Sequence, residues 1–124
     1  HCRDLYDYYV KGNSNCNEHS WSDKGNWTPV CYTSNPDQKQ TLGMWNKPKE
    51  IANYASYGFE IEHSHSPKDD MCNPICASTG WKNSSPHNAV MTNQGVWQKM
   101  NWKAMGIGLY KGYACVWFGD LADK

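Results

Sequence analysis

The chain has 124 residues, the size of one ordinary domain, and its twelve basic side chains balance its twelve acidic ones. That balance argues against a nucleic-acid partner, because proteins of that kind concentrate Lys and Arg to neutralise phosphates. No apolar run approaches the ~20 residues that cross a bilayer, so we also expect no membrane span.

The cysteine and aromatic contents are unusual. Six cysteines form an even set, which predicts three disulfide bonds and an extracellular, oxidising compartment, with the pairing left open. A metal site at Cys72 and Cys76 is the rival interpretation, but no second cysteine pair follows at zinc-ribbon distance. Seven Trp and eight Tyr predict an aromatic-rich core, and an exposed stacking platform for sugars or bases is the alternative.

Two tripeptides fit the acceptor pattern for N-linked glycans, so Asn26 and Asn83 are candidate glycosylation sites of a secreted glycoprotein. No signal peptide precedes Cys2, although the cysteines indicate secretion. We therefore expect a mature product or a fragment of one.

The first half of the chain predicts two helices, a long loop and a strand. Helical spacing of apolar residues predicts a helix within residues 2–11. Residues 13–46 lack a sustained periodicity, and we expect a packed loop held by its two cysteines. Residues 47–52 predict a short helix with Pro48 in its first turn, and alternation over residues 57–62 predicts a strand.

The second half predicts two more helices and a hairpin. One helix starts at about Thr79, and the next has Ser85 as its cap and Pro86 in its first turn. Residues 104–110 and 113–118 are two apolar runs separated by a turn that contains glycine, which favours a β-hairpin. The mixture predicts an α+β domain with an antiparallel sheet covered by helices.

Three segments resemble motifs of the CAP (SCP-like) superfamily, in its bacterial-type variant, and they occur in the family's order and at similar separations. They are Cys16-Asn17-Glu18-His19-Ser20, Tyr57-Gly58-Phe59-Glu60-Ile61, and the stretch from Trp81 to His87 with the later Gly106-Ile107-Gly108. This superfamily includes plant pathogenesis-related class 1 proteins and insect venom allergens. Ser84 stands where eukaryotic members carry a second Glu, and the family's first helix has no counterpart, which predicts a truncated or trimmed chain.

The resemblance implies one domain over residues 1–124, an α-β-α sandwich around a central cleft that holds His19, Glu60 and His87. In that cleft His19 and His87 would bind zinc or another divalent metal, and Glu60 would act as the base of a hydrolase. The alternative is that the same three groups hydrogen-bond one another. Nearness in sequence and the resemblance together favour the disulfides Cys16–Cys31 and Cys72–Cys76, which leaves Cys2–Cys115.

Two other groups of residues have plainer explanations. Glu62, His63 and His65 form a second polar cluster, which a solvent-exposed turn explains better than a metal site. His1 could chelate copper at a natural N-terminus, but truncation would make its position accidental.

A shared fold does not imply a shared activity. The first hypothesis is therefore a secreted CAP-like binding module of defence, signalling or venom type, rather than an enzyme. It would engage an extracellular lipid, glycan or protein as a monomer or weak homodimer. A zinc-dependent hydrolase and a structural component of the extracellular matrix are the alternatives.

Overall fold

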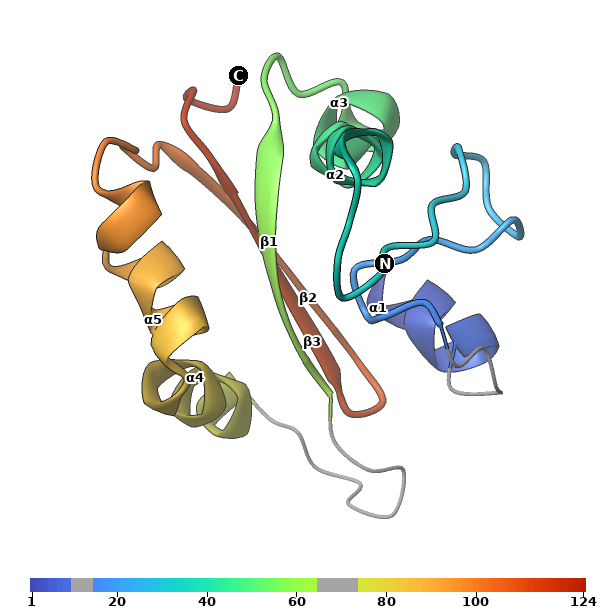
Figure 1. The fold of residues 1–124 in the computed structure, drawn as a ribbon, viewed down its shortest axis with the longest axis horizontal. Coiled ribbons are helices and arrows are strands. Elements are labelled where there is room, and N and C mark those ends of the chain that lie inside the picture. The colour runs from blue at the N-terminus through green and yellow to red at the C-terminus, as the bar shows by residue number, and fades with distance from the viewer. Residues whose placement is uncertain (10–14, 65–73) are drawn as a thin grey trace.

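The computed structural model describes residues 1–9, 15–64 and 74–124 and has the predicted α+β composition (Figure 1). The helices are α1 (Cys2–Asp4) with the π-helical η1 (Leu5–Tyr9), α2 (Gln38–Trp45), α3 (Lys47–Ala52), α4 (Pro74–Asn83), α5 (Ser85–Met91) and the 3₁₀ turn η2 (Gly95–Trp97). The strands are β1 (Gly58–Ser64), β2 (Ala104–Tyr110) and β3 (Tyr113–Gly119). No helix in the described ranges is long and apolar enough to cross a membrane.

The three strands form one antiparallel sheet in the order β1-β3-β2. β2 and β3 are the predicted hairpin, closed by the pair Tyr110 and Tyr113. The two residues between them, Lys111 and Gly112, have φ of 43° and 86°. Positive φ at both turn positions matches the right-handed twist of the flanking strands, which is why such short turns close hairpins.

Helices lie on both sides of the sheet (Figure 1). α4 and α5 lie on one side, where a core of Ile61, Val116 and Phe118 packs against Trp81 and Val90. The N-terminal helices lie on the other side, where Leu5 and Tyr113 form a smaller cluster around a disulfide.

The core is rich in aromatic side chains, as predicted. Trp21 and Trp81 are buried, and Phe59 contacts the rings of Trp45 and Trp97 at centroid distances of 5.0 and 5.3 Å. Rings of this kind bury large apolar areas in a chain that has few aliphatic residues.

One helix was not predicted from the sequence, and the starts of two others differ from the prediction. The segment expected to be all loop contains α2, because Asp37 and Gln40 form a reciprocal capping box at its start. α4 begins at Pro74, before the predicted start at Thr79. The residue preceding α5 is Ser84, not the predicted Ser85, and it makes no capping hydrogen bond through its side chain.

Two of the predicted disulfides are confirmed. Cys16 and Cys31 have Cα atoms 5.0 Å apart, and Cys2 and Cys115 have Cα atoms 6.2 Å apart. Both separations lie in the ordinary range for a disulfide. The predicted pair Cys72–Cys76 lies outside the described residues.

Candidate functional site

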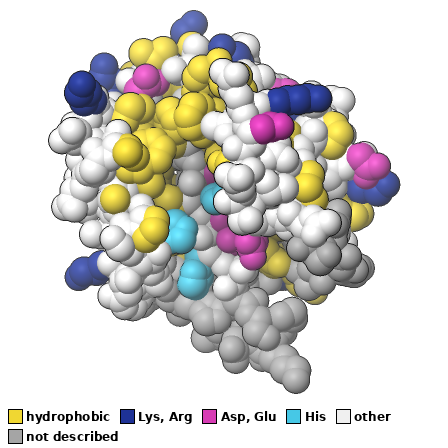
Figure 2. Space-filling view, viewed as in Figure 1, with side chains coloured by type: hydrophobic (Ala, Val, Ile, Leu, Met, Phe, Trp, Pro, Cys, Tyr) yellow, Lys and Arg dark blue, Asp and Glu magenta, His cyan; other side chains and the backbone are white. Residues whose placement is uncertain are grey.

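A buried carboxylate, Glu60 of β1, receives hydrogen bonds from two imidazoles. Its Oε1 is 2.5 Å from Nδ1 of His1, and its Oε2 is 2.9 Å from Nδ1 of His19. The Glu60 side chain is fully buried and that of His1 is 4% exposed. Histidine and acidic side chains gather in a hollow on this face of the molecule (Figure 2). Both carboxylate oxygens are therefore satisfied within the chain.

The proton equilibria of this group follow from its pairing. Burial alone would raise the pKa of Glu60, but the facing His1 and His19 lower it below 4.5. Burial alone would lower the pKa of His1, but the Glu60 carboxylate and the Ser20 carbonyl raise it above 6.5. The pair is thus a carboxylate and an imidazolium in weakly acidic solution.

Three kinds of contact hold His1, whose position the sequence predicts to be accidental if the chain is truncated. Its Nε2 donates to the Ser20 carbonyl at 2.9 Å, and its ring stacks on Trp21 at 4.0 Å with a 7° interplanar angle. The next residue, Cys2, is bonded to Cys115 of β3. His1 and Glu60 are 59 positions apart, so no local pattern could have signalled their contact.

His19 is positioned by the bridged loop. The Cys16–Cys31 disulfide closes the loop, and the Ser20 hydroxyl accepts from the Tyr32 amide at 2.8 Å. The Tyr32 ring meets the His19 ring edge to face at 5.5 Å. These contacts place His19 against the buried carboxylate of β1.

His87 lies apart from that hydrogen-bonded group. Its Nδ1 is 2.7 Å from the Ser84 hydroxyl at the start of α5. Burial lowers the pKa of His87, and the nearby positive charges of His19 and His63 lower it further. The structure therefore brings His19 and Glu60 into contact, whereas no hydrogen bond among the described residues joins His87 to either of them.

Glu62 is a second buried carboxyl that sequence reasoning did not assign to the cleft. It lies two residues beyond Glu60 on the same face of β1, and its Oε1 has no hydrogen-bond partner among the described residues. Burial, together with the charges of Glu18 and Glu60, raises the pKa of Glu62 to about 9. Glu62 is thus a neutral acid at pH 7.

The sequence predicted that His63 lies in a solvent-exposed turn, and this prediction is wrong. It is part of β1, on the face opposite Glu62, and its ring contacts Trp81 at 6.3 Å. A Cβ at Gly80 would lie 2.7 Å from the His63 ring, so the imidazole packs closely on α4. His65 lies outside the described residues.

The donor atoms, as arranged, do not fit a zinc ion held by His19, Glu60 and His87. Glu60 already accepts from two imidazoles, and the one described set of ligand atoms within 4.8 Å of one another is His1, Glu60 and Cys115. The sulfur of Cys115 is part of a disulfide and is not a thiolate ligand. The described arrangement therefore does not bring His19, Glu60 and His87 around one ion, and zinc binding itself stays a prediction.

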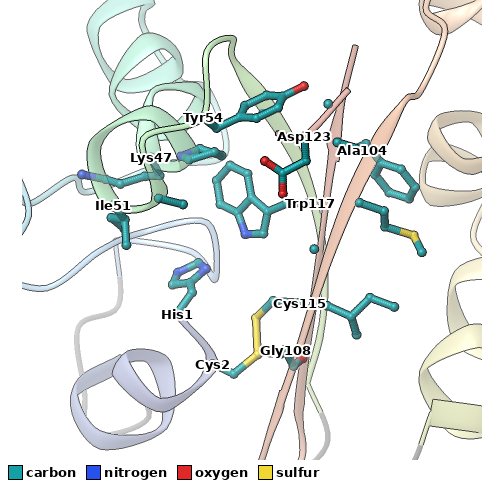
Figure 3. A pocket seen from close by; sticks show the side chains of 18 of the residues that line it. His1, Cys2, Lys47, Ile51, Tyr54, Ala104, Gly108, Cys115, Trp117 and Asp123 are labelled. Atoms are coloured by element: carbon teal, nitrogen blue, oxygen red, sulfur yellow. Dashed lines mark hydrogen bonds between the residues drawn. A yellow bond between two sulfur atoms is a disulfide. The ribbon is translucent and has the colours of Figure 1, made fainter. Parts of the chain in front are cut away.

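An apolar groove of about 360 Å³ lies over β2 and β3 (Figure 3), and His1 is among the residues that line it. Its walls include Trp117, Trp21, Tyr54 and Ile51. Glu60, Trp117 and Gly106 are paired across the sheet, so they share one row on one face. Trp117 thus lies between Glu60 and Gly106 in this row, and His1 of the imidazole–carboxylate group also lines the groove.

Glycines shape the floor of the groove. A Cβ at Gly106 would meet no atom within 4 Å, and one at Gly108 would meet only the Cys2 sulfur at 3.7 Å. Gly58 is different, because a Cβ there would lie 2.4 Å from Pro48. Gly106 therefore leaves space open to a ligand, whereas Gly58 allows α3 to pack on the sheet.

The two cations that face the groove are already paired. His1 is hydrogen-bonded to Glu60. The Nζ of Lys47 donates a hydrogen bond to the Thr28 carbonyl and another, of 2.6 Å, to Glu50 Oε2. A ligand in the groove therefore meets mainly apolar surface.

Neither a protein-family model, nor a curated protein, nor a solved structure matches the chain.

Proposed function

We propose that this chain is a secreted CAP-like binding module and that the groove beside Trp117 is its ligand site. The two disulfides and the absence of a membrane-spanning helix in the described ranges are compatible with secretion. The helices on both sides of the sheet are compatible with the α-β-α sandwich that the motif resemblance implies.

The observation that carries the proposal is an open apolar space built into the sheet. Ligand sites are typically concave and apolar, with a small number of oriented polar groups. The groove has that composition, with Trp117 as a wall and Gly106 as a vacant floor position. By contrast, the polar atoms of Glu60 and His1 are satisfied by each other, as expected for a structural pair rather than for a reacting centre.

Titration with an anilinonaphthalene sulfonate dye, an apolar fluorescent probe, tests the groove directly. Gly106→Leu adds a side chain at a position where a Cβ meets no atom within 4 Å, so the fold should persist while dye affinity falls by at least about tenfold. Leu109→Val is the matched control, because Leu109 belongs to the same strand but does not line the groove. Equal dye affinity in wild type and Gly106→Leu would contradict the proposal.

The zinc-dependent hydrolase is tested separately by calorimetry. If zinc is part of the function, the wild-type chain binds it and a His19→Ala, His87→Ala double variant does not. Zinc binding that the double variant retains would remove the predicted site.

A further inference from the structure

β2 is an edge strand whose central residues are exposed, although Cys2 of α1 contacts it at Gly108. It pairs only with β3, and its five central residues, Met105 to Leu109, are all exposed. On one face Gly106 and Gly108 open onto the groove. On the other, Met105, Ile107 and Leu109 are 62%, 63% and 46% exposed.

The exposed apolar side chains continue rows of the core. Ile61, Val116 and Ile107 are paired across the sheet, and the first two are 1% and 5% exposed. Phe59, Phe118 and Met105 form the neighbouring row. The buried core therefore runs to the edge of the sheet and stops there without cover.

The edge also lacks the features that normally protect an edge strand. Residues 104–110 contain no charge and no proline, and they pair with β3 without a bulge. In such an edge strand, every second residue directs its backbone N–H and C=O away from the paired strand β3 and toward solvent. Exposed, uncharged edges of this kind pair with further strands.

Charges at the two ends of β2 indicate which segment fits. Lys103 and Lys111 flank the strand, are exposed, and form no ion pair among the described residues. A second copy paired antiparallel about Ile107 would set Lys103 of each copy against Lys111 of the other, which is unfavourable. A strand with acidic residues at its ends would instead be attracted.

Resting on the proposed binding function, we infer that β2 adds an extended peptide segment of a partner protein to its free edge. Main-chain hydrogen bonds to β2 would supply affinity, and alternate side chains would supply specificity. On one face the peptide's apolar side chains reach the space left by Gly106 and Gly108; on the other they cover Met105, Ile107 and Leu109. Acidic residues at its ends face Lys103 and Lys111.

The test is calorimetric titration with a blocked synthetic peptide of alternating valine and threonine, as long as the seven residues of β2, with an added glutamate at each end. Its matched control has the same side chains but N-methylated amides at alternate positions, which cannot complete the ladder. We expect the N-methylated peptide to bind at least about tenfold more weakly.

Two variants examine the recognition. Ile107→Lys adds a charge to the exposed edge and should abolish peptide binding with an unchanged thermal melt. Lys103→Glu with Lys111→Glu should weaken binding of the glutamate-flanked peptide and restore binding when lysines flank it.

The experiments distinguish failure of the strand-addition proposal from failure of the groove as a ligand site. Absence of peptide binding, while the dye still separates wild type from Gly106→Leu, overturns strand addition and leaves the proposed function standing. Equal binding of the N-methylated peptide overturns it too. If the molecular mass in solution doubles with protein concentration and no peptide binds, the strand-addition proposal is also overturned. The free edge of β2 would then be occupied by a second copy of the chain.

Discussion

Glu62 gives the molecule a buried acid whose protonation should be visible in stability. Its pKa is about 9 when folded, against 4.5 for an ordinary glutamate, because burial and neighbouring carboxylates disfavour its charge. The folded state therefore binds one proton more than the unfolded state between these values. Stability must fall as pH rises through that range, by up to about 1.4 kcal/mol per pH unit.

Glu62→Gln should abolish that loss, because a neutral amide replaces the neutral acid. We expect the variant to match wild type near pH 4 and to exceed its free energy of unfolding at pH 8, measured by urea denaturation. Asp123→Asn is the control, since Asp123 is exposed, is not among the charges that raise the pKa of Glu62, and its substitution should change stability by no more than about 0.5 kcal/mol. Parallel pH profiles of wild type and Glu62→Gln would contradict the assignment.

The pair of His1 and Glu60 predicts the position of the stability optimum. Glu60 has a lowered pKa when folded, so its contribution is complete above 4.5 and is lost as pH falls. His1 has a raised pKa, so its contribution is complete below 6.5 and is lost as pH rises. Thermal melts should therefore peak between these values, and Glu60→Gln should flatten the peak. A maximum above pH 8 would exclude the ion pair.

At the level of individual residues, the candidate site could be predicted only in part from the sequence. The motif resemblance pointed to His19 and Glu60, which are in contact. His1 and Glu62 were noticed in the sequence, but their places in the site were not predictable. The contact of His1 with a partner 59 positions away depends on the folded arrangement, and so does the burial of an acid on a strand that alternates apolar and polar residues. An alternating pattern normally places its charges toward solvent.

The helices and strands that could be predicted were those marked by turn or helix-start residues in the local sequence. The β2–β3 hairpin and α3 have the predicted bounds to within a residue, since a glycine turn and a proline in the first helical turn are local signals. α2 was missed although Asp37 and Gln40 form a capping box, because weak apolar periodicity hid the helix. Burial of both glutamates of β1 was not predictable from local sequence.

The glycines of the sheet should differ sharply in tolerance. Gly58→Ala would place a Cβ 2.4 Å from Pro48 and 2.9 Å from Trp117, forcing α3 away from β1. We expect a loss of about 1–3 kcal/mol in the free energy of unfolding, as in other overpacked sites. Gly106→Ala meets open space and should be close to neutral. Equal effects of the two substitutions in denaturant titrations would contradict this account of the packing.

At the scale of the whole molecule, the Cys2–Cys115 disulfide closes the longer loop of the two described disulfides. It joins residues 113 apart, ties α1 to β3 and holds His1 beside the groove. Closing so long a loop restricts the unfolded chain by about 4–5 kcal/mol in the chain-entropy model. Replacing both cysteines by serine should lower stability by about that amount, whereas replacing Cys16 and Cys31, which are 15 residues apart, should lower it less. The reverse order in chemical denaturation would contradict this ranking.

The central claim is that the groove over β2 and β3 binds a ligand, and amide chemical-shift mapping tests it most directly. Titrating the oxidised chain with the anilinonaphthalene dye should shift the amides of Gly58, Gly106, Gly108 and Gly119, which all line the groove. Amides of α4 and α5, on the other side of the sheet, should stay unchanged. Shifts confined to those helices, or absent from the four glycines, would contradict a ligand site in the groove.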